Sequence, residues 1–232
     1  MKSNSKIAAI HQPDFLSYIG FFKKMSAVDT FIYLDNVQIA RRGWTHRDRI
    51  KTKNGFQWIN INLQKFKRDE IINNIKISYD ENWQLKSLNL IKENYKKSVF
   101  YDEIFPIIEK IFLIKPKFLL DFNLRCLTII REVLKINNEV IFSSDLKISE
   151  SKNQLLIEIL KKKNINKYLS GYGAKSYIDL DLFKRNNIEI IWNKFEHPIY
   201  KQQFNGFIKD LSIIDYLFNC GIKNAIKFFG KN

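Results

Sequence analysis

The fold is decided by residues 6–35, which read KIAAIHQPDFLSYIGFFKKMSAVDTFIYLD. The first six residues are mostly small or apolar and predict a short buried strand at 6–11. Helical spacing of apolar residues predicts a helix at 17–28 with Ser17 as its N-cap, and β-branched and aromatic residues predict a second strand at 30–35. A strand, a helix and a strand in this order form a βαβ unit, so the two strands should be parallel.

The alternation of strands and helices resumes in the second half of the chain. Short segments rich in Ile, Val and aromatic residues alternate there with longer segments of helical periodicity. The predicted strands are 139–143, 167–170 and 188–195, and the predicted helices between them are 150–163 and 175–186. This pattern predicts an α/β fold, with a mostly parallel sheet and helices on both of its faces.

The middle of the chain differs from this pattern. Residues 81–136 show helical periodicity and no strand signal, which predicts a helical insertion or cover. Pro106 suits the first turn of a helix, and the pair Lys115 and Pro116 should end that helix. The sequence therefore predicts several helices in this region, packed over the sheet or beside it.

Two further segments complete the predicted elements. Residues 56–63 and 71–78 alternate apolar and polar side chains, which predicts a hairpin or an edge pair. Near the end of the chain, Ser212 begins an S-x-x-D motif, a variant of the capping box, and Gly221 should terminate the helix that follows.

The composition is that of a globular protein. The chain has 232 residues, of which 45% are hydrophobic and 27% charged, so a single α/β domain over residues 1–232 is expected. Charges interrupt every apolar run before the roughly 18 residues that a membrane span needs. The apolar segment Ile7–Ile10 is shorter than the roughly 7–15 residues of a signal-peptide core, and two cysteines give no disulfide framework. These features predict a cytoplasmic protein without a membrane span.

The net charge of +15 is mostly diffuse. Lysines are spread along the chain, and the longest run is Lys161–Lys163. A nucleic-acid partner is not expected, because a nucleic-acid site needs clustered basic residues within a recognisable module. The exception is residues 41–51, RRGWTHRDRIK, where arginines surround a tryptophan.

This basic segment is a candidate for phosphate binding. Arg47 and Arg49 could form bidentate contacts with a diphosphate, and Trp44 could stack on a base or a sugar. We expect at least one guanidinium group to point into the substrate pocket. The alternative is a solvated basic loop without a ligand.

Polar residues follow several of the predicted strands. In open parallel sheets, ligands bind outside the carboxyl ends of the strands. His11, Asp35, Ser170 and His197 each end or follow a predicted strand. We therefore expect these four residues to lie around one shared pocket that takes a small molecule.

The turn after the first strand offers the candidate base. His11 is either a general base or phosphate ligand, or a turn histidine bonded to the backbone, and Pro13 should stiffen this turn. Asp14 either caps the following helix or orients His11. Asp35 ends an apolar strand, where an unpaired carboxylate would be costly, so it lies at the site or pairs with the nearby arginines.

Two weaker patterns lie in the second half of the chain. Ser170 and Gly171 begin an S-G-Y-G turn, whose backbone N–H groups could hold an anion or simply form a tight turn. Cys220 has no histidine close in sequence, so a nucleophilic role is not expected. No spacing of Cys, His or acidic residues predicts a metal site.

Several motifs together resemble the WbqC-like protein family. The first are I-H-Q-P-D, Y-I-G-F-F-K-K, F-I-Y-L-D-N-V-Q and W-T-H-R-D-R-I-K-T-K-N-G-F-Q-W, and the later ones are Y-L-S-G-Y-G-A-K-S-Y, E-H-P-I-Y and L-S-I-I-D-Y-L-F-N-C-G. They occur in the family's order, and the resemblance extends from Lys6 to about Gly221.

The resemblance implies a role in making surface polysaccharides of the O-antigen type. It implies an N-acyltransferase or amide-forming ligase that acts on a nucleotide-linked amino sugar, with an acyl or aminoacyl donor or ATP as the second substrate. In this hypothesis His11 is the first choice of base and His197 the second, Asp35 orients the base or binds the ammonium group, and Ser170 and Gly171 bind the developing oxyanion. The alternatives are a glycosyltransferase of the same pathway and a non-catalytic protein that binds a nucleotide sugar or RNA.

Overall fold

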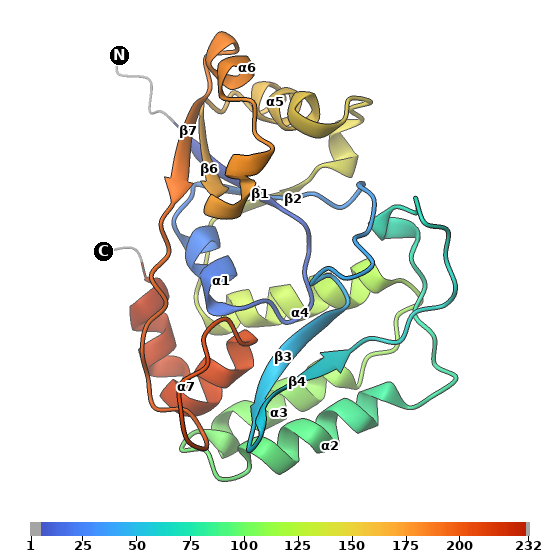
Figure 1. The fold of residues 1–232 in the computed structure, drawn as a ribbon, viewed down its shortest axis with the longest axis vertical. Helices are drawn as coiled ribbons and strands as arrows, with labels where there is room; N and C mark the ends of the chain where they lie inside the picture. The colour runs from blue at the N-terminus through green and yellow to red at the C-terminus, as the bar shows by residue number, and fades with distance from the viewer. Residues whose placement is uncertain (1–5, 231–232) are drawn as a thin grey trace.

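A five-stranded parallel sheet forms the centre of the protein, in a computed structural model that describes residues 6–230. The strands are β1 (Ile7–His11), β2 (Thr30–Tyr33), β5 (Glu139–Phe142), β6 (Lys167–Gly171) and β7 (Glu189–Asn193). They lie in the order β5-β2-β1-β6-β7, and every neighbouring pair is parallel (Figure 1). The predicted α/β fold is confirmed, including the parallel pairing of β1 and β2.

Helices cover both faces of this sheet, and its central strands β1, β2 and β6 are therefore buried. The connecting helices are α1 (Ile19–Ser26), α5 (Lys152–Lys162) and α6 (Leu180–Arg185). Ala8 and Ile10 of β1 belong to a core cluster with residues of α5 and α6, whereas Ala9 belongs to the cluster that contains α1. Successive strand residues point to opposite faces, so His11 lies on the same face as Ala9, against Phe21 of α1.

The strand order creates a crevice beside β1. From β1 the chain builds the sheet outward in one direction through β2 and β5, and then returns to add β6 and β7 on the other side. Open α/β sheets bind their ligands at such a reversal, outside the carboxyl ends of the strands. The carboxyl end of β1 is His11, which places this residue at the expected position.

A long insertion between β2 and β5 forms the other half of the molecule (Figure 1). It contains β3 (Arg47–Thr52), β4 (Gly55–Asn60), the short 3-10 helix η1 (Ile72–Asn74), α2 (Trp83–Tyr95), α3 (Tyr101–Phe112) and α4 (Leu119–Val133). The predicted helical region at 81–136 is confirmed. The C-terminal helix α7 (Ile213–Phe229) packs against both α1 and α3, and thereby joins the insertion to the sheet.

The predicted hairpin of 56–63 with 71–78 is wrong. Strand β4 pairs instead with β3, which lies in the basic segment for which no strand was predicted. Asn54 and Gly55 provide the reason, since Asn-Gly is a strong hairpin-turn signal and Gly55 adopts a φ of 112°. The segment at 71–78 contributes isolated antiparallel bridges, from Ile77 to Leu63, from Ile71 to Gln38 and from Lys76 to Phe118.

Two helix boundaries also differ from the prediction. Helix α3 begins at Tyr101, so Pro106 lies inside it and not in its first turn. The missing N–H of Pro106 leaves the carbonyl of Asp102 without a helical partner, and Asp102 is exposed, so water can hydrate this group. The predicted helix at 175–186 is divided, because the Asp179 side chain accepts a bond from the Leu182 N–H and starts α6 afresh.

The prediction for the C-terminal helix is confirmed at Ser212, whereas at Gly221 the helix is kinked and then continues to Phe229. Ser212 is the N-cap of α7, and its hydroxyl accepts a bond from the Ile214 N–H. Gly221 interrupts the helix with a φ of 75°, and a second helical segment continues after the kink. Within residues 6–230, none of the helices combines the length and the apolar character that crossing a bilayer would require.

Candidate functional site

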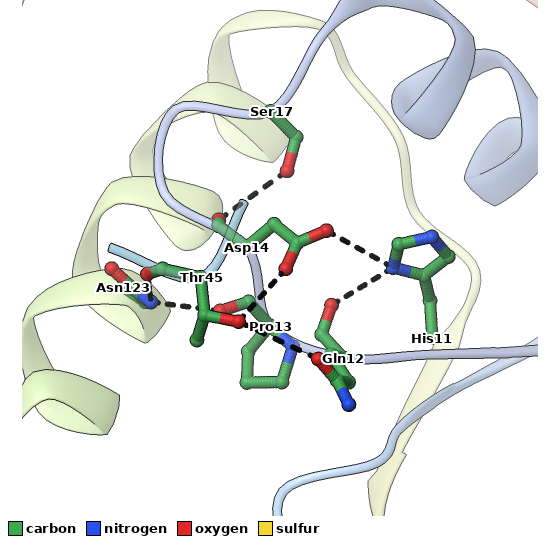
Figure 2. Close-up of polar contacts among 7 residues, drawn as sticks. All are labelled: His11, Gln12, Pro13, Asp14, Ser17, Thr45 and Asn123. Atoms are coloured by element: carbon green, nitrogen blue, oxygen red, sulfur yellow. Dashed lines mark hydrogen bonds and ion pairs between the residues drawn. The ribbon is translucent and has the colours of Figure 1, made fainter. Parts of the chain in front are cut away.

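The turn after β1 holds His11 in one orientation. Its Nδ1 lies 3.0 Å from the carbonyl oxygen of Gln12 and 3.5 Å from Oδ2 of Asp14 (Figure 2). A carbonyl oxygen only accepts hydrogen bonds, so Nδ1 carries the proton in the neutral ring. This leaves Nε2 as the basic nitrogen, and it makes no hydrogen bond to any residue that the structure describes.

Asp14 lies against His11 and does not cap the following helix. Its Oδ1 accepts a hydrogen bond of 3.3 Å from the Thr45 hydroxyl, and its backbone carbonyl accepts one from Ser17 (Figure 2). Helix α1 begins at Ile19 with Tyr18 as an N-cap that makes no side-chain bond. The prediction of Ser17 as the N-cap is therefore wrong. Of the two alternatives for Asp14, the geometry favours the one in which Asp14 orients His11.

Asn123 of α4 fixes this turn to the insertion. Its Nδ2 donates to the carbonyl oxygens of Pro13, at 2.8 Å, and Thr45, at 2.6 Å (Figure 2). The Asn123 side chain is fully buried, so these bonds form away from water. One amide thus connects the turn after β1 with the segment that leads into β3.

A buried lysine, Lys24 of α1, acts on both members of the pair. Burial, together with the positive charge of Lys24, lowers the pKa of His11 to about 3. Burial raises the pKa of Asp14 to about 7, against the opposing effects of the Thr45 hydroxyl and Lys24. Burial also lowers the pKa of Lys24 to about 8, and Asp14 opposes this shift. Two groups of the site therefore titrate close to neutral pH.

Two cavities meet at His11, Asp14 and Trp44, which line both of them. The larger has a volume of about 750 Å³ and continues between β1, β6 and α5, where Ile10, Tyr168 and Leu155 are apolar lining residues. The smaller has a volume of about 370 Å³ and is completed by Ser17, Tyr18, Asp48, Arg49 and Asp210. Together they form a continuous candidate site at the crevice beside β1.

The two candidate arginines point in different directions. Arg49 lines the smaller cavity and donates to the backbone carbonyl of Asp210 at 2.8 Å. The Cζ atom of Arg49 lies 5.2 Å from the centre of the Trp44 ring. Arg47 instead stacks on Trp58, with its Cζ atom 4.3 Å from the ring centre, and lines a separate surface hollow with Arg41. Of the two, only Arg49 reaches the site around His11.

Asp35 holds two strand ends together. Its Oδ1 accepts bonds from the Ser143 hydroxyl and the Ser144 N–H, and its Oδ2 accepts a 2.6 Å bond from the Ser144 hydroxyl. The side chain is buried at 3% exposure and lines neither of the two cavities. The structure thus pairs Asp35 with hydroxyl groups after β5, and not with His11 or an arginine.

The other three predicted residues lie at or beyond the ends of strands but do not line these cavities. Ser170 is buried at 1% exposure, and Gly171 ends β6 opposite Asn193 of β7. His197 lies beyond β7, where its Nδ1 is 2.9 Å from the Pro198 carbonyl and its ring stacks with Tyr200. The structure does not bring the four expected residues into one pocket, although each follows a strand of the same parallel sheet.

Sequence reasoning missed three charged residues of the site. Lys24 lies three residues after Phe21 on the buried face of α1, and a lysine on an apolar helix face was a usable signal. Asp48 alternates with arginines along β3, which becomes informative only once this segment is recognised as a strand. Asp210 lies far away in the sequence and carried no local signal.

The described residues offer no ready metal centre. Within residues 6–230, no three His, Cys, Asp or Glu side chains are grouped closely enough to hold a metal ion.

Comparison with known proteins identifies the family of the chain. It is 31% identical over 219 residues to the uncharacterized protein Rv1507c of Mycobacterium tuberculosis (strain ATCC 25618 / H37Rv), and the alignment covers 93% of this chain and 94% of that protein. No solved structure matches the chain at a significant level. The profile of the WbqC-like family matches residues 12–227, which include most of the site and helix α7. The chain therefore belongs to the WbqC-like protein family.

Proposed function

We propose that this protein is an enzyme of surface polysaccharide biosynthesis that attaches an acyl or aminoacyl group to the amine of a nucleotide-linked amino sugar. Membership of the WbqC-like family suggests a role related to polysaccharide biosynthesis. The observation that carries the proposal is the His11–Asp14 pair, which lines a cavity together with Trp44 and Arg49 at the reversal point of the sheet. A base beside an aromatic ring and a guanidinium group suits a substrate with both an amine and a nucleotide.

Arg49 and Trp44 are the proposed contacts for the nucleotide. The guanidinium group can donate charge-assisted hydrogen bonds to a diphosphate, and the indole can stack on a base or a sugar ring. Trp44 is 43% exposed and reaches both cavities, so a ligand can lie on its ring and extend to either side. The larger cavity, with its apolar lining from Ile10 and Leu155, is the proposed place for the acyl donor.

The chemical step begins with the amine of the sugar. This amine is largely protonated near neutral pH and becomes a nucleophile only after it loses a proton. Nε2 of His11 accepts that proton, while the Asp14 carboxylate holds Nδ1–H and stabilises the positive charge on the ring. The amine nitrogen then attacks the carbonyl carbon of the donor. The new C–N bond forms as the bond to the donor's leaving group breaks, and His11 returns its proton to that group. The nitrogen of the product then loses its second proton through His11 to the solvent, which leaves a neutral amide.

The pH dependence of this step should follow Asp14. Because the pKa of His11 is about 3, its ring is already neutral throughout the physiological range, and a rate step at the ordinary imidazole value is not expected. The pKa of Asp14 is about 7, so the carboxylate that stabilises protonated His11 appears as the pH rises through neutrality. The rate should therefore increase with pH around this value.

The test is a transfer reaction followed by mass spectrometry. Purified protein is incubated with a panel of nucleotide-linked amino sugars and acyl or aminoacyl donors, with and without ATP, and the mass gained by the sugar identifies the group transferred. His11→Asn should lower turnover by ~10²–10⁴-fold, the usual contribution of a positioned base, with little change in substrate affinity. His46→Asn is the matched control, because His46 lines neither of the two cavities.

Two results would count against this assignment. Turnover of His11→Asn within about threefold of wild type would remove His11 from the role of base. Tight binding of a nucleotide sugar without transfer from any donor would identify a binding protein in place of an enzyme.

A further inference from the structure

We infer that residues 57–67 line a surface groove that binds a linear oligosaccharide with negative charge. The segment belongs to the insertion, and none of these described residues lines either of the two cavities at His11. Binding in this groove is therefore a separate property from the reaction proposed at His11. It gives the insertion a role besides placing Trp44 and Arg49 at that site.

Three surface hollows follow one another along this segment. The central hollow has a volume of about 890 Å³ and is lined by Asn60, Asn62 and Gln64. A second hollow, of about 260 Å³, shares Asn60 and Asn62 with it and continues to Trp58. A third, of about 420 Å³, shares Gln64 and Phe66 with the central one and continues to η1. Because neighbouring hollows have lining residues in common, together they form one elongated groove.

The backbone of this segment remains extended beyond the end of β4. The Ile61 N–H donates to the carbonyl that precedes β3, and Leu63 forms an antiparallel bridge with Ile77. Successive side chains of an extended chain point to opposite faces. Ile59 and Ile61 are accordingly buried at 2% exposure, whereas Asn60 between them is exposed. The alternate side chains from residue 58 to residue 64 therefore form a row of roughly 20 Å, which is long enough for several sugar rings.

Three side-chain amides in this row are available to a ligand. Within residues 6–230, the amide groups of Asn60, Asn62 and Gln64 make no hydrogen bond to the protein, although all three side chains line the groove. Each amide offers both donors and an acceptor, and a sugar hydroxyl likewise donates and accepts. A row of amides along an extended strand therefore suits a chain molecule that has hydroxyl groups on every unit.

An aromatic ring lies near each end of the row of amides, and an arginine lies against each ring. The Cζ atom of Arg47 is 4.3 Å from the centre of the Trp58 ring, and that of Arg41 is 5.8 Å from the centre of the Phe66 ring. Two backbone carbonyls also accept hydrogen bonds from the Arg47 guanidinium group and hold it in place. Aromatic rings can pack against the apolar face of a sugar, and guanidinium groups bind carboxylates.

The central hollow has free positive charge. Its acidic side chains have partners, since Glu81 pairs with a lysine of α2 at 2.6 Å and Asp80 accepts a 2.7 Å bond from a serine hydroxyl. Its basic side chains Arg41, Arg47 and Lys65 form no ion pair with any acidic residue of the described chain. Carboxylate groups on the ligand would supply the missing partners.

These features agree with an acidic oligosaccharide better than with single-stranded RNA. RNA carries a phosphate on every unit, and Asp80 and Glu81 in the wall of the central hollow would repel a regular row of phosphates. Single-stranded nucleic acids also need open aromatic faces on which bases stack, whereas Arg47 already lies over Trp58. A sugar chain can instead place hydroxyl donors beside the two carboxylates.

The test is isothermal titration calorimetry at low ionic strength with chains of known charge and length. Hexagalacturonate should bind wild-type protein at least tenfold more tightly than maltohexaose, which has the same length but no charge. It should also bind at least tenfold more tightly than monomeric galacturonate, because a single sugar reaches only part of the groove. The affinity for hexagalacturonate should fall as salt is added, since exposed charges are screened.

Substitutions divide the contribution of the amides from that of the charges. Asn62→Ala and Gln64→Ala should each weaken the binding of hexagalacturonate by about three- to tenfold, the effect of one neutral hydrogen bond. The double variant Arg41→Gln/Lys65→Gln should weaken hexagalacturonate at least tenfold and maltohexaose by less than about threefold.

Matched controls are Asn205→Ala and Lys184→Gln, which change exposed residues that do not line the three hollows. Both should bind hexagalacturonate like wild type. The amides of Asn62 and Gln64 have no partner in the described chain, so their variants should keep the wild-type midpoint of urea unfolding. A loss of affinity then reports on binding and not on folding.

No detectable binding of hexagalacturonate at millimolar concentration would overturn the inference, as would equal affinities of the groove variants and the controls. Tighter binding of hexauridylate that is weakened by the same substitutions would identify an RNA groove and would reject the sugar assignment. The titrations contain no nucleotide sugar and no acyl donor. Their result is therefore independent of whether the reaction proposed at His11 takes place.

Discussion

At the scale of single residues, the main feature of the site is the displacement of three pKa values by burial. The pKa of Asp14 rises to about 7, while those of His11 and Lys24 fall to about 3 and about 8. Burial disfavours the charged form of every group, so it moves acids and bases in opposite directions. Such shifts are concentrated at functional sites, where they keep groups ready to exchange protons near neutral pH.

The raised pKa of Asp14 predicts a pH-dependent loss of stability. Between its ordinary value of 3.8 and about 7, Asp14 keeps its proton in the folded state but has lost it in the unfolded state. The folded state then binds more protons, so this contribution to the free energy of unfolding decreases as the pH rises through the interval. Asp14→Asn removes the effect. The free energy of unfolding of the variant, relative to that of wild type, should therefore rise by up to about 4 kcal/mol as the pH increases from 3.8 to about 7.

Urea unfolding of wild type and Asp14→Asn across this pH interval measures the effect. His11 contributes in the opposite direction, since its lowered pKa makes the protein more stable as the pH rises from about 3 to 6.5. Both proteins contain His11, so this contribution largely cancels in the difference. Asp69→Asn, a control substitution at an exposed residue, should show no such change of stability with pH. A constant difference for Asp14→Asn would mean that Asp14 ionises at its ordinary value.

At the scale of elements, helix α7 is shaped by one glycine. Gly221 has a φ of 75°, which side chains other than glycine rarely adopt, and this residue separates the two segments of the helix. A Cβ atom at this position would lie 2.6 Å from ring atoms of Phe100, at the start of α3. The kink therefore allows the helix to pack closely on the insertion.

Gly221→Ala should destabilise the protein by at least about 2 kcal/mol. The left-handed conformation costs a residue with a Cβ atom roughly 1–2 kcal/mol, and the contact with Phe100 adds to this cost. Gly173→Ala is the matched control, because a Cβ atom there meets nothing within 4 Å. The control should change stability by less than about 0.5 kcal/mol. Equal unfolding midpoints for the two variants would show that the kink is not under this constraint.

At the scale of the whole molecule, the site depends on contacts between the sheet and the insertion. His11 and Asp14 come from the turn after β1, whereas Trp44, Asp48 and Arg49 come from the insertion. Asn123 joins these parts through its bonds to Pro13 and Thr45 (Figure 2). On the far side of the hairpin, the ammonium group of Lys51 donates to Gln202, which in turn donates to the buried carboxylate of Asp215 on α7.

Asn123→Ala should weaken both the fold and the site. The change leaves the buried carbonyls of Pro13 and Thr45 without a donor, at about 1–3 kcal/mol each. We expect a total loss of about 2–4 kcal/mol in urea unfolding, together with weaker binding of a nucleotide sugar. The control Asn94→Ala removes a single, partly exposed bond to Leu90 and should cost less than about 1 kcal/mol. A loss for Asn123→Ala no larger than that of the control would contradict the bridging role.

The amino-acid sequence by itself determined the parallel sheet, the helical middle and the position of His11. These features depend on local periodicity and on the βαβ rule, so short windows such as residues 6–35 contain the necessary information. The same reasoning missed β3, because its charged residues Arg47, Asp48 and Arg49 resemble a loop until a partner strand is known. Strand pairing depends on residues that lie apart in the sequence, so a short window does not contain it. In β3, moreover, charged residues occupy buried positions, so the usual alternation of apolar and polar residues is absent from the sequence.

Only the tertiary structure decided which polar residues share a site. Asp35 and His11 end neighbouring strands, yet Asp35 turns toward the serines after β5, while Lys24 and Asp210 come close to His11 from α1 and from the segment before α7. The sequence shows that a polar residue ends a strand but not the direction of its side chain. That direction follows from which hydrogen-bond partners and charges the packed elements bring within reach, because a buried polar group must find a partner inside the protein.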